Sequence, residues 1–263
     1  MKTLFSIIFL LCISTFAQAE IQIQEIKYTT GKAQLNGYLV YNDAIKEKRP
    51  GILVVHEWWG HNEYARSRAR MLAELGYTAF AVDMYGDGKL AAHPSDASKF
   101  MQEAFTDFET TKARFEKAKE ILKSHKTVDA SRIASIGYCF GGAVSLRMAR
   151  GGSDLKGVVA FHSALPLEPK ISKGKMNTSI LIANGSEDSF LKPETIAAFT
   201  SDLVQANSDF TYLSLSGIKH SYTNPKADEF GKKFNIPNLK YDKKADIRSW
   251  AEMQRFFDRI FAQ

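Results

Sequence analysis

The sequence predicts an α/β fold, with a mostly parallel central sheet, an N-terminal antiparallel hairpin and helices on both faces. The main observation is that short apolar runs, typical of strands, alternate with longer amphipathic segments, typical of helices. Strands separated by helices form parallel sheets covered on both sides. The composition agrees, because 44% hydrophobic residues with 17 Gly and 7 Pro among 263 residues is typical of a globular chain with a packed core.

The expected strands follow from local patterns of polarity. Apolar and polar residues alternate at 21–28 and 33–41, around Thr30-Gly31, which predicts the antiparallel hairpin. The continuous apolar run at 51–56 is typical of a strand that is buried on both faces. Further strands are predicted, in chain order, at 78–82, 132–138, 157–161, 179–183 and 210–215.

Helices are expected between these strands. Their predicted positions, in chain order, are 66–75, 96–124, 140–150, 192–205 and 242–261. Gly76 and Gly151-Gly152 follow two of them, where glycine commonly ends a helix. The long segment 96–124 has an apolar stripe that is expected in the core rather than at a cofactor, namely Phe100, Phe105, Phe108, Phe115 and Leu122. Residues 221–240 are interpreted as irregular, with a flap as one interpretation.

Residues 1–19 are predicted to be a secretory signal peptide. Met1 and Lys2 form a basic start, residues 4–16 are almost wholly apolar, and Ala17-Gln18-Ala19 is a small-x-small cleavage site. Cleavage leaves residues 20–263 as a single domain of an exported protein, with a retained anchor as the alternative. No membrane span is expected after cleavage.

Charge and cysteine content limit the classes of partner. The 35 Lys and Arg exceed the 29 Asp and Glu only mildly, giving a net charge of +6, so no nucleic-acid partner is expected. Two cysteines exclude a disulfide scaffold and a four-cysteine zinc site. Removal of 1–19 leaves Cys139 as the single thiol, which is unusual in an oxidising compartment. A buried, inert cysteine is the alternative to a functional one.

One motif points to chemistry. The segment Gly137-Tyr138-Cys139-Phe140-Gly141-Gly142 lies between a predicted strand and a predicted helix. This is the context of a nucleophile elbow, G-x-Nu-x-G, with cysteine as the nucleophile. Glycines two positions away allow the strained turn, and the helix N-terminus favours a thiolate and later an oxyanion. A phosphate-binding loop is excluded because no Lys-Ser/Thr follows.

Candidate partners for this nucleophile follow later strands. Glu187 and Asp188 come after the strand at 179–183, and His220 comes after the strand at 210–215. An acid followed by a histidine is the order that a nucleophile elbow requires. All of these residues are expected at the carboxyl edge of the sheet, where open α/β sheets bind ligands. Spacing alone does not separate Glu187 from Asp188.

The segment His56-Glu57-Trp58-Trp59-Gly60 follows the first buried strand, where such a fold builds the rest of its oxyanion hole. It superficially resembles the zinc motif H-E-x-x-H, but position 60 is Gly and the segment follows a strand, so no metal site is expected. The remaining histidines are expected at ordinary surface or core positions: His61, His93, His125 and His162. Of these, His162 is the one expected near the pocket, because it follows a strand.

With these residues in this order, the chain resembles the dienelactone hydrolase family over essentially all of residues 20–263. The motifs GYCFGG and HEWWG are specific together. The resemblance implies an α/β-hydrolase fold in which Cys139 is the nucleophile and His220 the base. It also implies that Asp188, rather than Glu187, is the carboxylate that orients the histidine.

Further roles and two departures come from the same resemblance. Glu57 matches a glutamate that contacts the resting thiol, and the backbone N–H groups of Trp58 and Phe140 match the oxyanion hole. The family's type enzymes hold the substrate carboxylate with two arginines, but this chain has Asp87 and Asn224 at those positions. Their replacement should weaken binding of such a carboxylate.

The resemblance predicts hydrolysis of a small ester or lactone through a thioester intermediate, without a cofactor. The thiol is expected to rest neutral beside Glu57. The expected pocket residues are Trp59, Tyr85, His162 and Asn224, with Trp58 also in the aromatic wall. Such a wall suggests a neutral or apolar acyl substrate. The alternatives are an inert binding protein on a hydrolase scaffold and an exported thiol or redox sensor.

The expected location is the periplasm, with secretion as the alternative. Asn184-Gly185-Ser186 has the form of a glycosylation sequon but lies beside the proposed acid, where a glycan would be awkward. A bacterial envelope setting avoids that conflict. The oligomeric state stays open.

Overall fold

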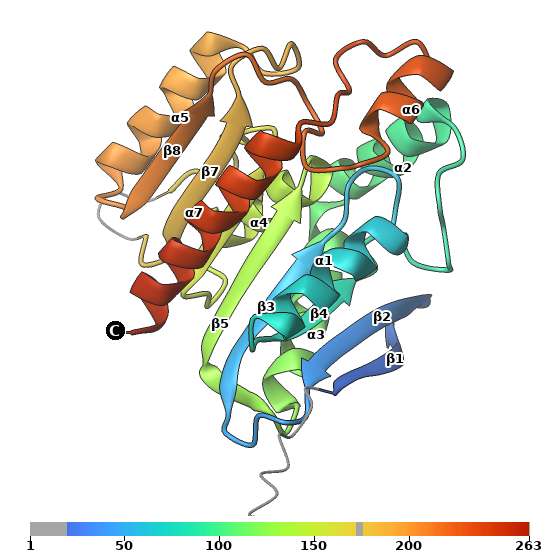
Figure 1. The fold of residues 1–263 in the computed structure, drawn as a ribbon, viewed down its shortest axis with the longest axis vertical. Helices are drawn as coiled ribbons and strands as arrows, with labels where there is room; N and C mark the ends of the chain where they lie inside the picture. The colour runs from blue at the N-terminus through green and yellow to red at the C-terminus, as the bar shows by residue number, and fades with distance from the viewer. Residues whose placement is uncertain (1–19, 172–175, 263) are drawn as a thin grey trace, which may run out of the picture.

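The core of the protein is a mostly parallel sheet. A computed structural model describes residues 20–171 and 176–262, within which eight strands form one sheet in the order β1-β2-β4-β3-β5-β6-β7-β8 (Figure 1). The strands are β1 (Ile21–Thr30), β2 (Ala33–Asn42), β3 (Arg49–Val55), β4 (Thr78–Val82), β5 (Val128–Tyr138), β6 (Gly157–Phe161), β7 (Ser179–Gly185) and β8 (Phe210–Leu215). β2 pairs antiparallel with β1 and β4, and the remaining pairs are parallel. This confirms the predicted sheet and hairpin. The predicted signal peptide, 1–19, lies outside the described residues.

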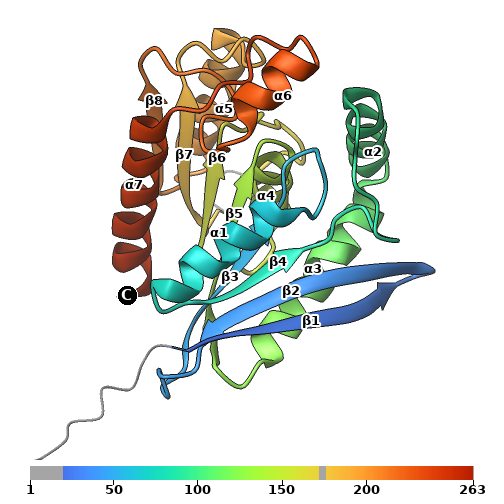
Figure 2. The same ribbon diagram turned by 45° about the vertical axis from the view of Figure 1, so that its right-hand side comes forward.

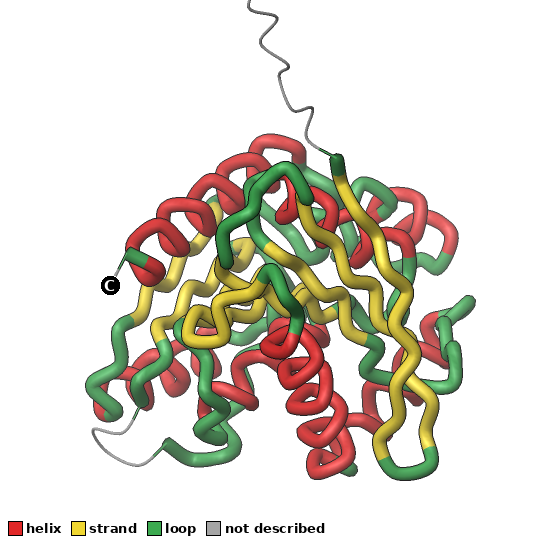
Figure 3. The backbone as a smooth tube through the Cα atoms, turned by 90° about the horizontal axis from the view of Figure 1, so that it is seen from below, coloured by secondary structure: helices red, strands yellow, loops and turns green. Residues whose placement is uncertain are grey.

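Helices cover both faces of the sheet. α1 (Glu63–Glu74) and α7 (Lys243–Phe261) pack on one face, and α3 (Phe108–Ser124), α4 (Phe140–Arg150) and α5 (Pro193–Gln205) pack on the other. Seen along the sheet, the strands form a layer between the helices (Figure 3). α2 (Pro94–Thr106) and α6 (Ala227–Lys233) lie toward the carboxyl ends of the parallel strands (Figure 2). None of the helices in the described ranges has the length and apolar composition needed to cross a bilayer.

The alternation of side chains along each strand supplies both hydrophobic layers. In β3, Ile52 and Val54 join the cluster formed with α1 and α7, whereas Leu53 and Val55 join the cluster formed with α3, α4 and α5. All four side chains are fully buried. Complete burial of such a side chain contributes about 1.5–3 kcal/mol. The apolar run at 51–56 is continuous because both faces of this strand are covered.

Residues 96–124 form two helices, so the prediction of one long helix was wrong. The chain breaks at Asp107, which has φ −97° and ψ 72° between α2 and α3. Its side chain accepts a hydrogen bond from the Thr110 N–H at 3.0 Å and so caps α3. Because of this break, the apolar residues of α2 and those of α3 face different parts of the molecule. Phe115 of α3 is buried against the sheet, whereas Phe105 of α2 lines a cavity at the sheet edge.

The segment 221–240 is more regular than predicted. It contains α6, and its end returns to the start of the segment, where Leu239 and His220 form a parallel bridge. The Lys240 N–H donates to the His220 carbonyl at 3.0 Å. This segment therefore closes over the carboxyl ends of the strands and is tied to His220 at both ends.

Candidate active site

Cys139 lies on a strained turn between β5 and α4. Its backbone has φ 52° and ψ −114°, a conformation that non-glycine residues rarely adopt. The turn requires glycine on both sides, because a Cβ at Gly137 would lie 2.1 Å from the Gly141 carbonyl oxygen, and one at Gly141 would lie 2.2 Å from the Val55 carbonyl oxygen. α4 begins at Phe140, so the free N–H groups of its first turn are next to the thiol.

Asp188 and His220 form a buried pair. Asp188 follows β7 and His220 follows β8, and neighbouring parallel strands bring these residues together at one edge of the sheet. His220 Nδ1 and Asp188 Oδ2 are 2.6 Å apart. Asp188 Oδ1 accepts further hydrogen bonds from the Phe190 N–H and from Asn238 Nδ2, both at 3.0 Å. Burial alone would raise the pKa of Asp188, but the bonds from His220 and Asn238 lower it below its ordinary value.

His220 also interacts with Cys139. Burial of the imidazole would lower its pKa, but the negative charge of Cys139 and the hydrogen bond to Asp188 raise the pKa to about 10. His220 is therefore placed to take a proton from Cys139 and to hold it as an imidazolium. The neutral resting thiol expected from the sequence stays a prediction.

Glu57 is buried beside these residues and is held by donors on the loop after His220. Ser221 Oγ donates to one carboxylate oxygen at 3.1 Å, and Asn224 Nδ2 donates to the other at 2.6 Å. Burial raises the pKa of Glu57, and the donors and the charge of His220 oppose this rise. The expected contact was with the thiol; in this structure the hydrogen bonds of the carboxylate go to Ser221 and Asn224.

A cavity of about 420 Å³ opens onto Cys139 and His220. Its walls are mostly apolar and come from α2, the start of α4, the segment 221–240 and the loops that follow β3, β6, β7 and β8. The lining consists of Trp58, Met101, Phe105, Cys139, Phe140, Ala143, Ser163, Ala164, Asp188, Phe190, Leu191, His220, Ile236 and Leu239. These lining residues include no Lys or Arg.

The four residues predicted to form the pocket lie just outside this cavity. Trp59 is only 4% exposed because its ring packs against Phe230 and Phe234, with centroids 4.7 and 5.7 Å away. Tyr85 lies behind Trp58, to whose carbonyl it donates at 3.0 Å.

The other two predicted pocket residues also contact residues of the site without lining the cavity. Asn224 is turned toward Glu57, as described above. His162 is fully buried behind His220, with ring centroids 5.1 Å apart, and its Nε2 is 2.7 Å from Thr223 Oγ1. Burial and the neighbouring His220 lower the pKa of His162 well below its ordinary value, so this ring is neutral. Both residues therefore support the site rather than line the cavity.

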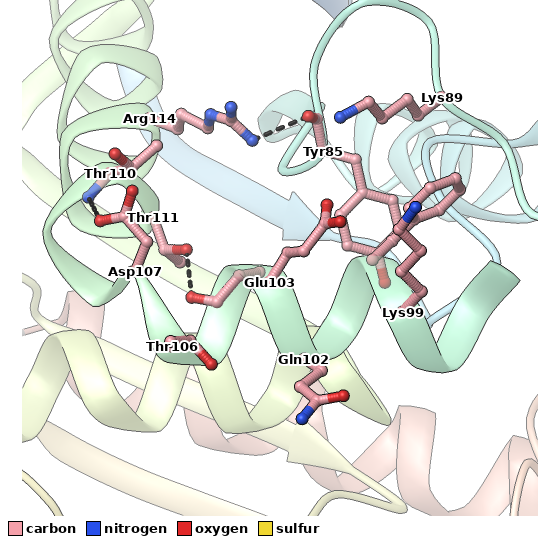
Figure 4. Close-up of a pocket in the computed structure, with 12 residues that line it drawn as sticks. Tyr85, Lys89, Lys99, Gln102, Glu103, Thr106, Asp107, Thr110, Thr111 and Arg114 are labelled. Carbon is pink, nitrogen blue, oxygen red and sulfur yellow. Dashed lines mark hydrogen bonds between the residues drawn. The ribbon is translucent and has the colours of Figure 1, made fainter. Parts of the chain in front are cut away.

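A larger cavity, of about 560 Å³, lies between α2, α3 and the loop after β4 (Figure 4). Tyr85 forms part of its wall, and the other lining residues include Lys89, Lys99, Glu103 and Arg114. This cavity contains none of the thiol, imidazole or carboxylate groups described above, and its charged groups are of both signs. It is not the candidate active site.

Several residues of the site have no signature in the sequence. Asn238 lies in a segment that was interpreted as irregular, yet it is buried and bonds Asp188. Phe105 belongs to the apolar stripe that the sequence places in the core, and Met101, on the same helix, is not among the predicted site residues. No local pattern could have identified Asn238, whereas the aspartate cap at position 107 was a signal for the helix break that points Phe105 into the cavity.

No group of three or more His, Cys, Asp and Glu side chains within 20–171 and 176–262 is arranged to hold a metal ion. In the HEWWG segment, both ring nitrogens of His56 are engaged by backbone groups, the Glu57 carbonyl and the Met84 N–H.

Comparison with known proteins is consistent with this geometry. A model of the dienelactone hydrolase family matches residues 35–261. Protein usf of Aquifex pyrophilus is 25% identical over 210 residues, which cover 78% of this chain and 89% of that protein. A protein of Aquifex aeolicus, provisionally named carboxymethylenebutenolidase, is 23% identical over 238 residues, covering 89% of this chain and 97% of the relative.

A solved structure resembles the whole domain. The crystal structure of a dienelactone hydrolase-like promiscuous phosphotriesterase from metagenomic libraries superposes with a TM-score of 0.86 at 33% identity. The match covers 92% of this chain and 99% of that one. An α/β-hydrolase from a deep-sea metagenome library, at 16% identity and a TM-score of 0.70, shares the fold.

Proposed function

Because this chain belongs to the dienelactone hydrolase family, whose model matches residues 35–261, we propose that it hydrolyses a carboxylic ester or lactone through Cys139, His220 and Asp188. The observation that supports the proposal best is the 2.6 Å contact between His220 Nδ1 and Asp188 Oδ2 beside a thiol on a strained turn. A nucleophile, a base and an orienting carboxylate in this relation are the parts needed for acyl transfer.

The first half-reaction forms a thioester. The Cys139 thiolate attacks the carbonyl carbon, and the carbonyl π electrons move to the oxygen. The N–H groups of Trp58 and Phe140 stabilise this oxyanion; loss of one such donor typically lowers the rate ~10²–10³-fold. When the tetrahedral intermediate collapses, the C–O bond to the leaving group breaks. His220 then donates its proton to the leaving alkoxide and becomes neutral.

The second half-reaction restores the enzyme. Neutral His220 removes a proton from a water molecule, whose oxygen attacks the thioester carbonyl. The C–S bond breaks, the acid product leaves, and the pair returns to thiolate and imidazolium. Asp188, with its lowered pKa, remains a carboxylate throughout and stabilises the imidazolium. In this scheme His220 already holds the proton of Cys139, and the Glu57 carboxylate stays bonded to Ser221 and Asn224.

The cavity supports a neutral substrate with an apolar acyl group. Its lining is largely aromatic and aliphatic and includes no Lys or Arg. Asp87 and Asn224 stand where the type enzymes of the family hold arginines, and Asn224 is already engaged with Glu57. A carboxylate on the substrate would lose its hydration in this cavity without gaining an arginine partner.

Neutral phosphotriesters are a second candidate substrate class. The same apolar cavity, whose lining includes no Lys or Arg, suits an uncharged triester. A relative that is 33% identical over 92% of this chain is described as a promiscuous phosphotriesterase. We expect this activity to be weaker than ester hydrolysis, because the proposed deacylation step is specific to a carbonyl.

We further propose that the protein acts outside the cytoplasm, in the periplasm or as a secreted enzyme. The proposal rests on the basic start, apolar run and Ala17-Gln18-Ala19 site of the sequence. Fractionation of cells that express the full chain tests it. We expect the mature protein in the envelope fraction to begin at Glu20, and an intact Met1 in the cytosol would contradict export.

The function is tested with p-nitrophenyl esters of increasing acyl length, a lactone, a thioester and a neutral phosphotriester. We expect the wild type to turn over the apolar esters and Cys139→Ala to retain less than about 1% of that rate. Mass spectrometry of the acid-quenched reaction should show the acyl group on the Cys139 peptide.

Other outcomes would point to the alternatives. Turnover that persists in Cys139→Ala would contradict the proposed nucleophile. Saturable binding of the esters without turnover would indicate an inert binding protein. Sulfenic acid on Cys139 after peroxide treatment, without any ester turnover, would indicate a thiol sensor.

A further inference from the structure

His56 bridges the ends of two neighbouring strands. It directly follows β3, and its Nδ1 is 2.5 Å from the Glu57 carbonyl oxygen. The Met84 N–H, just beyond β4, donates to its Nε2 at 3.2 Å. Because Nε2 accepts a hydrogen bond, the ring proton must be on Nδ1, which therefore donates to the Glu57 carbonyl.

That carbonyl belongs to the same peptide group as the Trp58 N–H. We propose that His56 is a positioning residue for the oxyanion hole, because its Nδ1–H orients and polarises the Glu57–Trp58 peptide. A hydrogen bond to a peptide carbonyl makes the N–H of that peptide a stronger donor. The inference rests on the proposed function, since the Trp58 N–H matters only if an oxyanion forms.

The surroundings of His56 hold it rigidly. Arg114 donates to the Tyr85 carbonyl at 2.8 Å (Figure 4) and to the Met84 carbonyl at 2.7 Å, and these bonds fix the segment that bonds Nε2. The ring also packs between Tyr85 and Phe140, with centroid distances of 4.8 and 5.7 Å. Phe140 carries the other expected oxyanion donor, so His56 touches both sides of the hole.

A second hydrogen bond fixes the next peptide. The Tyr85 hydroxyl donates to the Trp58 carbonyl at 3.0 Å, so both peptides that flank the Trp58 Cα are held from the same side. His56 is fully buried, and burial lowers the pKa of its ring. The ring is therefore neutral at neutral pH, with its single Nδ1 proton directed at the Glu57 carbonyl.

Two isosteric variants separate the two ends of the imidazole. In His56→Asn, the side-chain NH₂ can replace the Nδ1 donor to Glu57 but cannot reach Met84. In His56→Gln, the amide oxygen can replace the Nε2 acceptor for Met84, but the donor to Glu57 is lost. Tyr85→Phe removes only the hydroxyl donor to the Trp58 carbonyl and tests the neighbouring peptide.

Two reactions of the same thiol give the readout. Acylation by p-nitrophenyl acetate passes through an oxyanion, whereas alkylation by iodoacetamide displaces iodide and forms none. We expect His56→Gln to slow acylation at least ~10-fold, with alkylation unchanged within about twofold. His56→Asn should recover acylation to within about fivefold of wild type, and Tyr85→Phe should slow acylation alone by a smaller factor.

Equal acylation rates in the wild type and in His56→Gln would overturn the inference. It would also be overturned if both His56 variants and Tyr85→Phe lost acylation and alkylation to the same extent. If both His56 variants fail to fold, a Tyr85→Phe variant that acylates at the wild-type rate also overturns it. A wild-type enzyme that is alkylated but never acylated would instead overturn the proposed function. The two failures are therefore distinguishable.

Discussion

At the scale of single residues, the site depends on which of two adjacent acids faces the imidazole. Glu187 and Asp188 are neighbours in sequence, but their side chains leave the turn after β7 in different directions. Asp188 is buried and bonds His220, whereas Glu187 is exposed. The shorter side chain thus supplies the carboxylate, and the longer one stays in solvent.

This neighbouring pair provides a matched test. We expect Asp188→Asn to lower kcat/KM for an apolar p-nitrophenyl ester ~10²–10⁴-fold, because the amide no longer holds the imidazolium. Glu187→Gln removes the same charge one residue away and should leave kcat/KM within about twofold. Steady-state kinetics of both variants at one pH measure this, and similar losses in the two would reject Asp188 as the orienting acid.

The charge on His220 depends on Cys139. Burial is the largest effect and opposes a charged ring, but the interactions with Cys139 and Asp188 together outweigh it and raise the pKa of His220 to about 10. We therefore expect Cys139→Ala to lower this pKa, while Asp188 still keeps it above the value that burial alone would set. NMR titration of the ring signals from pH 5 to 11 measures it; a pKa that stays near 10 in Cys139→Ala would show that Asp188 alone is responsible.

The same shift makes a prediction about stability. Because the pKa of His220 is raised on folding to about 10, its contribution to stability is fully present below about pH 6.5 and is lost as the pH rises toward 10. The unfolding free energy of the wild type relative to His220→Gln should therefore be larger at pH 6 than at pH 10. Urea unfolding at the two pH values tests the sign, and a difference that grows with pH would contradict it.

At the scale of elements, the turn from β5 to α4 depends on close backbone contacts. Gly137 has no space for a Cβ, since the Gly141 carbonyl oxygen would be 2.1 Å away, and this carbonyl is backbone that cannot rotate aside. A turn this tight brings the backbones of β5 and α4 into direct contact, so glycine is required where they meet. Gly151, at the other end of α4, has its nearest atom at 3.2 Å.

These two glycines are a second matched pair. We expect Gly137→Ala to destabilise the protein by about 3 kcal/mol and to abolish ester turnover, because the turn must open to admit the methyl group. Gly151→Ala should change stability by less than about 1 kcal/mol, since a small shift accommodates it. Urea unfolding and turnover of both variants test this, and a stable, active Gly137→Ala variant would show that the turn is not constrained as described.

At the scale of the whole molecule, Arg68 ties three parts of the fold together. It lies on α1, donates to the Thr223 carbonyl on the loop after His220, and forms an ion pair of 2.8 Å with Asp246 on α7. Its guanidinium also lies 5.4 Å from the Trp250 ring centroid. The loop that carries Ser221 and Asn224 is thereby fixed against the helices of one face of the sheet.

Arg66 on the same helix is the control for Arg68. Arg68→Met leaves Asp246 as a carboxylate whose side chain is only 14% exposed, so we expect a loss of about 3 kcal/mol. Arg66→Met breaks a pair in which Arg66 is 29% and Glu25 53% exposed, and should cost less than about 1 kcal/mol. Urea unfolding measures the loss of unfolding free energy in both variants. Equal losses would mean that the buried contacts of Arg68 stabilise the protein no more than the exposed ion pair of Arg66.

The α/β class and the sheet with its hairpin could be inferred from the sequence alone. The same holds for the cysteine elbow and for the positions of the acid and the histidine that are its partners. These features depend on local patterns: buried parallel strands are continuously apolar, and a nucleophile elbow needs glycines at fixed spacing. Residues that follow parallel strands meet at one edge, so Cys139, Asp188 and His220 could be placed together without coordinates.

The tertiary structure alone determined which side chains line the cavity and which support it. The predicted pocket residues lie on segments that surround the cavity, namely Trp59, Tyr85, His162 and Asn224. Each of these side chains contacts a residue that only tertiary packing brings close to it. Asn238 and Phe105 enter the site from a return loop and a helix broken by its cap. Sequence patterns report the face of an element on which a residue lies, but the partner on that face comes from contacts between segments far apart in the chain.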